Sequence, residues 1–469
     1  MNAPAPRPLR FAVAPSGFKE SLSAREAAEA IAEGLRRVVP DADTDLIPLV
    51  DGGEGTAEAL AAATGGALHH LTATGPTGVA VPTHFALLGP GARGPAGART
   101  AAVEMAAVAG LSLVPPDQRD PGATTTRGVG ELIRAALDFG ARRVLVGCGD
   151  SGTSDGGAGA LQALGARLLD ADGRELPPGG RALTRLARVD RSRLDPRLAE
   201  TELLVACNPF NVLCGPQGVA RVFGPQKGAS PAQVEELSAA LERWAHILAR
   251  DVSGPAVALA SPAPGPPPGA APAPAHAAPG AAPALALLPS AAGGVDLRHG
   301  PGTGASGGLG AGLAAIGARL LPRFDVLLDG LDLDARLARA DLVVTAEGAL
   351  DRQTTRGKIP AEVARRAKAH GRPVLALAGT IGEGAQEVRG AGVDAYHGIL
   401  PAPVALAEAL GRGREFLTDA AEAALRMILI GTRLTAAPGR FAPVAAPITA
   451  PSPGPGRLVP LPGPPAASR

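Results

Sequence analysis

The chain has 469 residues, a formal net charge of +1 and 46% hydrophobic residues. A charge so close to zero gives no basic field for nucleic acid or an anionic membrane, and no stretch of about 20 apolar residues predicts a membrane span. The three cysteines cannot all pair within one chain, which fits a reducing cytosol, and they form no CxxC pair of the zinc-binding kind. We therefore expect a cytoplasmic protein of two or three domains with no nucleic-acid or membrane partner.

The first part of the chain alternates predicted strands and helices. The apolar runs FAVA and LIPLV, residues 11–14 and 46–50, are predicted strands. Between them, Ser23 and Glu26 form a capping box, and apolar residues then recur at helical spacing. A second helix is predicted near residues 56–63, which gives the βαβα order of a doubly wound sheet.

The pattern changes near His69. Runs broken by Gly and Pro predict hairpin-linked strands, followed by a helix, the strand RRVLVG and a helix that carries Leu161, Leu164 and Leu168. These elements predict a second α/β domain with a mixed sheet. Residues 255–289 are nearly all Ala, Pro and Gly, and the tail 436–469 is similar. Such segments cannot bury enough apolar surface to offset their ordering entropy, so we predict that both are disordered.

Regular structure is predicted again from Gly302 onward. Leu309, Leu313, Ile316 and Leu320 predict one helix, and the runs DLVVT, VLALA and AYHGIL predict three more strands. With the two early strands, they make five candidate parallel strands. We infer a flavodoxin-like, doubly wound α/β domain of residues 8–68 and 325–435, split by an inserted α/β domain of residues 69–324.

Four of these strands end in short, polar, glycine-containing turns. In an open parallel sheet such turns lie along one edge, and ligands bind there. The first turn offers Ser16 and Lys19, and the second offers Asp51, Gly52 and Gly53. Lysine suits a phosphoryl or carboxylate oxygen, and carboxylates on a mobile glycine backbone suit Mg²⁺. Ordinary βα turns with helix caps are the structural alternative.

The densest polar run is residues 147–157, between a predicted strand and a predicted helix. Its backbone amides and the helix start favour an anion. We expect Ser151, Thr153 and Gly156 to cradle a phosphate, with Asp155 as the acid–base group. A G-x-G-x-x-G match that begins at Gly147 could indicate a dinucleotide fold, but a lone match is weak evidence.

Other polar loops extend the candidate site. Two loops and a second glycine-rich segment offer amides, an amine and a hydroxyl for substrate or phosphate: Asn208, Asn211, Lys227 and Ser306. The segment after the strand DLVVT offers groups that suit a nucleotide or metal site, and equally helix capping: Glu347, Asp351, Thr354 and Lys358.

Taken together, these segments resemble the type I glycerate kinase family. The matching stretches occur in family order and include APSGFKESLSA, PLVDGGEGT, VEMAAVAGL, GDSGTSDGGAGALQALGARLLD, FGPQKGA, SGGLGAGL and DLVVTAEGALDRQTTRGKIP. They cover most of residues 10–434 outside the Ala/Pro-rich insertion. The resemblance implies ATP- and Mg²⁺-dependent phosphorylation of glycerate, most often to the 2-phosphate, by a flavodoxin-like domain split by a second domain.

Several residues depart from the common family pattern. In GDSGTSDGG, Asp150 adds a carboxylate and Ser154 replaces an amide. Asn208 stands where an aspartate is often found, and Ala349 takes the place of a usual basic residue. An arginine lost from a phosphate or carboxylate pocket removes a bidentate contact, so these departures bear on the substrate rather than on the fold.

The expected mechanism is phosphoryl transfer in a cleft between the domains. Asp51 or Glu347 would hold Mg²⁺, Lys19 and Lys227 would offset phosphate or carboxylate charge, and Asp155 would orient or deprotonate the acceptor hydroxyl. The alternatives are a kinase for a related small sugar acid, a ligand-binding regulator without turnover, and a nucleotide-dependent dehydrogenase.

Overall fold

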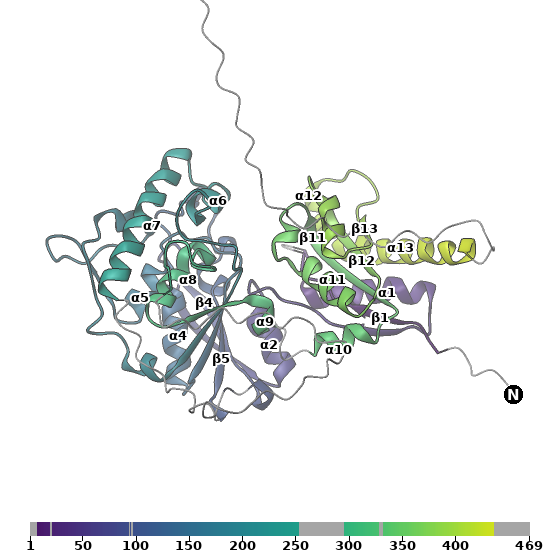
Figure 1. The fold of residues 1–469 in the computed structure, drawn as a ribbon, viewed down its shortest axis with the longest axis horizontal. Helices are drawn as coiled ribbons and strands as arrows, with labels where there is room; N and C mark the ends of the chain where they lie inside the picture. Colours follow the sequence, from purple (N-terminus) through teal and green to yellow (C-terminus); the bar gives the residue numbers. More distant parts are fainter. Residues whose placement is uncertain are drawn as a thin grey trace, which may run out of the picture.

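A computed structural model describes residues 7–18, 21–92, 94, 97–252, 295–327 and 332–435. Two lobes lie side by side, each built around one large sheet (Figure 1). The segments 255–289 and 436–469, for which disorder was predicted, lie outside the described residues, as does Lys19. Among the described helices, none is both long enough and apolar enough to cross a bilayer.

The first lobe contains a five-stranded, wholly parallel sheet, which confirms the predicted flavodoxin-like class. The strand order is β2-β1-β11-β12-β13, which is the flavodoxin order 2-1-3-4-5. The strands are β1 (Arg10–Val13), β2 (Asp43–Leu46), β11 (Leu342–Leu350), β12 (Val374–Ile381) and β13 (Ala395–Gly398). The strand predicted at residues 46–50 was misplaced, because β2 ends at Leu46; the amides of Ile47 and Leu49 still donate to the oxygens of Val13 and Pro15.

Helices cover both faces of this sheet. Phe11 and Val13 face one way, toward α1 (Ala24–Val38) and α13 (Gly413–Thr435). Ala12 and Ala14 face the other way, toward α10 (Leu333–Ala338) and α11 (Ile359–Ala369). The short helix α12 (Leu406–Gly411) precedes α13. The predicted capping box of Ser23 and Glu26 starts α1.

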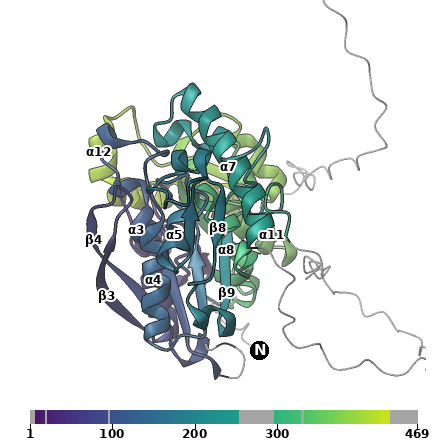
Figure 2. The same ribbon diagram turned by 90° about the vertical axis from the view of Figure 1, so that its left-hand side faces the viewer.

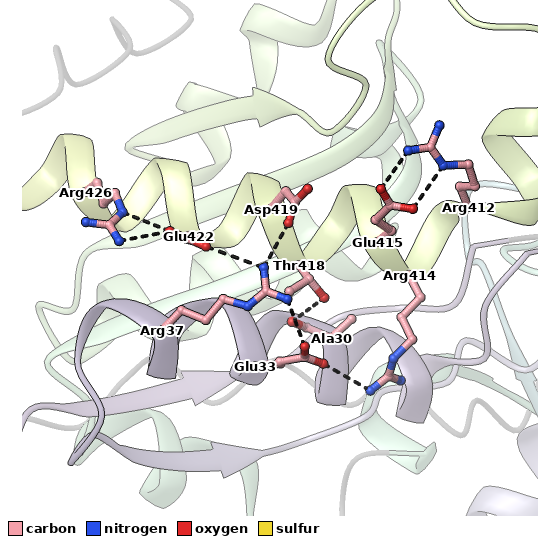
Figure 3. A network of polar contacts seen from close by, with 10 residues as sticks. All are labelled: Ala30, Glu33, Arg37, Arg412, Arg414, Glu415, Thr418, Asp419, Glu422 and Arg426. Atoms are coloured by element: carbon pink, nitrogen blue, oxygen red, sulfur yellow. Dashed lines mark hydrogen bonds and ion pairs between the residues drawn. The ribbon is translucent and has the colours of Figure 1, made fainter.

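Helices α1 and α13, from the N-terminal and C-terminal parts of the first lobe, pack against each other (Figure 3). A Cβ atom at Gly34 would overlap the carbonyl oxygen of Thr418, so only glycine lets the helices approach this closely. Arg37 makes ion pairs with Glu33 on its own helix and with Asp419 and Glu422 on α13. Exposed pairs of this kind contribute little each, so the packing of the two helices is the main source of their association.

The second lobe contains the predicted mixed sheet, with strand order β10-β9-β6-β5-β4-β3. The pairs β3–β4 and β4–β5 are antiparallel, and the remaining pairs are parallel. Figure 2 shows β3 and β4 at one edge of this lobe. The strands are β3 (Ala67–Thr74), β4 (Ala80–Leu87), β5 (Thr100–Glu104), β6 (Arg143–Gly147), β9 (Glu202–Cys207) and β10 (Arg319–Pro322); β7 (Arg167–Leu169) and β8 (Arg188–Asp190) form a separate pair.

The second sheet is also covered on both faces. The larger core lies under α4 (Arg127–Asp138), α5 (Ala158–Ala163), α7 (Pro231–Asp251) and α8 (Ala305–Ala315), with α3 (Ala106–Ala109) and α6 (Val219–Phe223) beside them. The other face packs against α2 (Thr56–Thr64) and α9 (Arg323–Leu327). Helix α2 thus contacts the second sheet, although it lies within the range predicted for the first domain; the exact domain limits stay a prediction.

Two helices end earlier than the apolar spacing predicted. Helix α5 ends at Ala163 and Leu168 lies in β7, while α8 ends at Ala315 and Leu320 lies in β10. In each case a glycine with positive φ follows the helix, Gly165 at 106° and Gly317 at 101°. A left-handed residue stops a helix, and the apolar residues beyond it then face the core from a strand.

Candidate active site

The chain crosses from the first lobe to the second directly after the polar turn that follows β2. Here the backbone of Gly52 and Gly53 lies against the turn that follows β6 in the second lobe. A Cβ at Gly149 would lie 2.6 Å from the amide nitrogen of Gly53, and one at Gly147 would lie 2.9 Å from the oxygen of Gly52. Two of the predicted glycine-rich turns therefore meet, and their glycines permit the close backbone contact.

Arg323 holds this junction together. It starts α9, where the chain leaves the second lobe, and its side chain is almost completely buried. One guanidinium nitrogen donates to the carbonyl oxygen of Asp51 at 3.1 Å and to its carboxylate at 3.0 Å, and the other nitrogen donates to the oxygen of Gly357. Arg323, in the segment by which the chain leaves the second lobe, is thereby joined to Asp51, in the segment by which the chain enters it, and to the loop before α11.

Sequence reasoning did not single out Arg323. The only signal was an arginine directly after the apolar run LLP. Its partners are distant in the chain: Asp51 lies 272 positions away and Gly357 lies 34 positions away. No local pattern specifies such a contact.

The second carboxylate of the predicted site, Glu347, lies near the end of β11. Thr354 donates its hydroxyl to Glu347 at 2.6 Å, and the Lys358 amine lies 3.8 Å from Glu347 and 3.4 Å from Asp351. The structure therefore brings together all four residues that were predicted to bind a nucleotide. Burial raises the pKa of Glu347 to about 7, and the charges of Asp351 and Asp51 add to the rise.

The two carboxylates predicted as metal ligands already have cationic partners. Asp51 pairs with Arg323 and Glu347 with Lys358. Within the described ranges, no group of three or more His, Cys, Asp or Glu side chains could hold a metal ion. The side chain of Asp51 is 43% exposed and that of Glu347 is 8% exposed, so Asp51 is the more accessible of the two to a ligand.

A buried lysine organises the turn after β6. The Lys227 amine donates to the hydroxyl of Ser151 at 2.8 Å and to the carbonyl oxygen of Thr153 at 2.7 Å. Burial lowers the pKa of Lys227 to about 7. Ser306 lies on a segment with positive φ, and a Cβ on the next residue, Gly307, would overlap the oxygen of Thr153. The predicted residues Ser151, Thr153, Lys227 and Ser306 thus share one neighbourhood.

Asp155 has the contacts of a structural residue. It is fully buried, and its carboxylate accepts from the amide of Thr126 at 2.8 Å, from the Thr126 hydroxyl, and from the amides of Gly157 and Gly159 at 3.0 and 3.1 Å. Thr126 precedes α4 and Gly157 precedes α5, so one carboxylate caps two helices. Burial raises the pKa of Asp155. This geometry does not support the expected acid–base role, because the carboxylate is occupied by the protein itself.

The remaining candidates are also held by the protein. Gly156 accepts from the indole nitrogen of Trp244 at 2.8 Å, and a Cβ there would lie 2.5 Å from the ring. Ser16 donates its amide and its hydroxyl to the carbonyl oxygen of Ala346 in the neighbouring strand β11, at 2.8 and 3.0 Å.

The two asparagines lie in the loop after β9. Asn208 accepts from the amide of Phe210 at 3.0 Å and lies beside Gly357 of the first lobe. The backbone of Asn211 donates to the oxygen of Asn208 and accepts from the amide of Gly304, both at 3.1 Å. Their roles in substrate binding stay predictions.

Comparison with known proteins gives one consistent result. The model of the glycerate kinase family matches residues 11–429. The chain is 42% identical to a glycerate kinase of Bacillus subtilis (strain 168), over 87% of this chain and 95% of that protein. It is 38% identical to a glycerate 2-kinase of Escherichia coli (strain K12), over 91% and 99%. A crystal structure from Salmonella typhimurium LT2, assigned as a glycerate kinase 2, superposes with a TM-score of 0.67 at 40% identity and covers 91% of this chain and 100% of that one.

The contacts of Asp155 predict a structural phenotype. Asp155→Asn places an amide group among four donors, so we expect a loss of at least about 2 kcal/mol in the free energy of unfolding, measured with urea. Asp170→Asn is the control, because Asp170 also accepts backbone amides but lies at the surface; there we expect a change below about 0.5 kcal/mol. A variant with wild-type stability but at least hundredfold lower kcat would restore Asp155 to the chemistry.

Proposed function

The chain belongs to the glycerate kinase family, and we propose that it transfers the γ-phosphoryl group of ATP to glycerate, with 2-phosphoglycerate as the product. The protein is a kinase by its family. The observation that carries the proposal is the junction at Arg323, where the turn that follows β2 meets the glycine-rich turn after β6 and is tied to the loop before α11. The 2-phosphate product is proposed from the likeness to the glycerate 2-kinase of Escherichia coli.

Phosphoryl transfer depends on positioning and on charge neutralisation rather than on covalent chemistry by the protein. The two sides of the junction suit these two tasks. Lys358, Thr354 and Glu347 belong to the nucleotide side, where the amine can offset phosphate charge. The turn held by Lys227 and Ser151 belongs to the acceptor side, where glycerate would bind.

Asp51 is the carboxylate best placed to touch a ligand. It is the most exposed of Asp51, Glu347 and Asp155, and it lies where the two lobes meet. We propose that it holds the metal, as expected from the sequence, or orients the acceptor hydroxyl, the role expected of Asp155. Lys227 is a positioning residue, because its buried amine binds the Ser151 hydroxyl and the Thr153 carbonyl oxygen and does not reach an open cleft.

Mg²⁺ fits this site as a companion of the nucleotide. The exposed carboxylate of Asp51, alone or with Glu347, would hold the ion, since Mg²⁺ is usually bound by one or two carboxylates together with substrate phosphates. When bound, the ion neutralises charge on the transferred phosphoryl group.

One departure from the family pattern, Asp150, does not favour a different sugar acid. The added carboxylate of Asp150 accepts from the amide of Glu54 at 3.4 Å and lies against Gly53. It therefore contacts the loop that crosses between the lobes, and its contact supports the junction instead of a changed substrate pocket.

The proposal is tested by incubating the purified protein with ATP, Mg²⁺ and a panel of small hydroxy acids. We expect ADP release with glycerate well above that with the other acids, and phosphorus NMR should identify 2-phosphoglycerate. Preferential turnover of another sugar acid would contradict glycerate as the substrate, and formation of 3-phosphoglycerate would contradict the proposed product. Ligand binding without ADP release would favour a non-catalytic regulator.

The role of Asp51 predicts a separate effect. In Asp51→Asn we expect kcat to fall by about 10²-fold or more, because the lost charge can neither orient the hydroxyl nor hold Mg²⁺. Asp45→Asn is the matched control: Asp45 also lies near β2 and pairs with an arginine, Arg336, but away from the junction. Equal kcat values in the two variants would remove Asp51 from the mechanism.

A further inference from the structure

A hollow of about 210 Å³ lies at the meeting point of the two lobes. The second lobe contributes residues 208–210 and the crossing segment 322–325, and the first lobe contributes Gly357, Glu362 and Arg365. The hollow therefore adjoins the junction described above, because Arg323 and Gly357 belong to both.

Flat apolar surfaces line much of this hollow. Phe210 is 69% exposed, in a chain whose aromatic residues amount to only 2%. Pro209, Pro322 and Phe324 lie around it in the same lining. A single exposed phenylalanine is unremarkable by itself, but here it borders a cavity of a size that could take an aromatic ring.

The lining also holds a donor that lacks an acceptor. The Nε–H of Arg323 is buried and has no hydrogen-bond partner among the residues that the structure describes, although both other nitrogens are used. The guanidinium carbon lies 5.0 Å from the centre of the Phe324 ring. Because this nitrogen exposes almost no surface, a ligand in the hollow would meet the apolar lining rather than the Nε–H of Arg323.

The charges around the hollow argue against a free anion as its ligand. Arg365 pairs with Glu362 at 2.7 Å, and Arg323 pairs with Asp51. Asp325 adds a further carboxylate to the lining. With its cations already paired and an additional acidic group present, the hollow offers no excess positive charge for a phosphate. A neutral, flat ring fits better.

We infer that this hollow binds the base of the nucleotide, a purine ring that stacks on the exposed Phe210. Gly357 is followed directly by Lys358, whose amine lies beside Glu347 and Asp351. A nucleotide with its base in the hollow would thus direct its phosphates toward the carboxylates of the junction. This inference rests on the proposed use of ATP and adds where the base is recognised.

The test compares a ligand that has the base with one that lacks it. Calorimetry measures the Kd of ADP and of inorganic tripolyphosphate for the wild type, Phe210→Ala and Phe210→Trp. We expect Phe210→Ala to weaken ADP by about tenfold or more, as for loss of a base–aromatic stack, and to leave tripolyphosphate unchanged. Phe210→Trp should restore ADP affinity, and its new indole should change fluorescence on binding ADP, since Trp244 is fully buried.

Phe139→Ala is the matched control, because Phe139 is also an exposed phenylalanine but lies at the end of α4; it should bind ADP as the wild type does. Wild-type ADP affinity in Phe210→Ala, or equal weakening of ADP and tripolyphosphate, would overturn the inference while leaving the kinase assignment intact. A wild-type protein that binds neither ligand and releases no ADP with glycerate would instead overturn the proposed function, and this inference with it.

Discussion

The arrangement of the two lobes depends on the hydrogen bonds that the guanidinium of Arg323 donates. This guanidinium joins the segment by which the chain enters the second lobe, through Asp51, to the segment by which it leaves, and ties both to Gly357 in the first lobe. Because the fork of an arginine can serve several acceptors at fixed angles, one buried side chain holds the turn after β2 beside the loop before α11. Arg323 and Gly357 also line the neighbouring hollow.

Enclosure at this junction has an electrostatic consequence. Burial brings the pKa of Glu347 up to about 7 and the pKa of Lys227 down to about 7. Both groups therefore titrate near neutrality, where small changes in their surroundings alter their charge. Asp51, which stays exposed, differs from them in its accessibility to ligands. The site thus combines two buried groups, Glu347 and Lys227, which hold the loops in place, with the exposed carboxylate of Asp51, which a substrate can contact.

Most of the sheet of the first lobe was predictable because β1, β11 and β12 contain continuous apolar runs. The polar β2 was misplaced, and the glycines predicted to end β11 and β12 lie within those strands. The cluster of Glu347, Thr354 and Lys358 was predictable because its members are close in sequence. Asp155 shows the limit: a conspicuous acidic residue in a polar run caps two helices instead. The partners of Arg323 are distant in the chain, and the early ends of α5 and α8 depend on single left-handed glycines, so periodicity alone could not reveal them.

If Arg323 places the lobes for catalysis, its replacement should impair turnover, and Arg336 offers a matched comparison. Arg336 likewise donates to an aspartate, Asp45, and to a backbone oxygen, that of Leu46, but within the first lobe. The decisive measurement is kcat/KM for glycerate in Arg323→Lys and Arg336→Lys, with the free energy of unfolding measured in parallel. We expect similar losses of stability, with kcat/KM at least about tenfold lower in Arg323→Lys alone, because a compact ammonium cannot reach both Asp51 and Gly357 as the planar guanidinium fork does. Wild-type kcat/KM in Arg323→Lys would contradict the account.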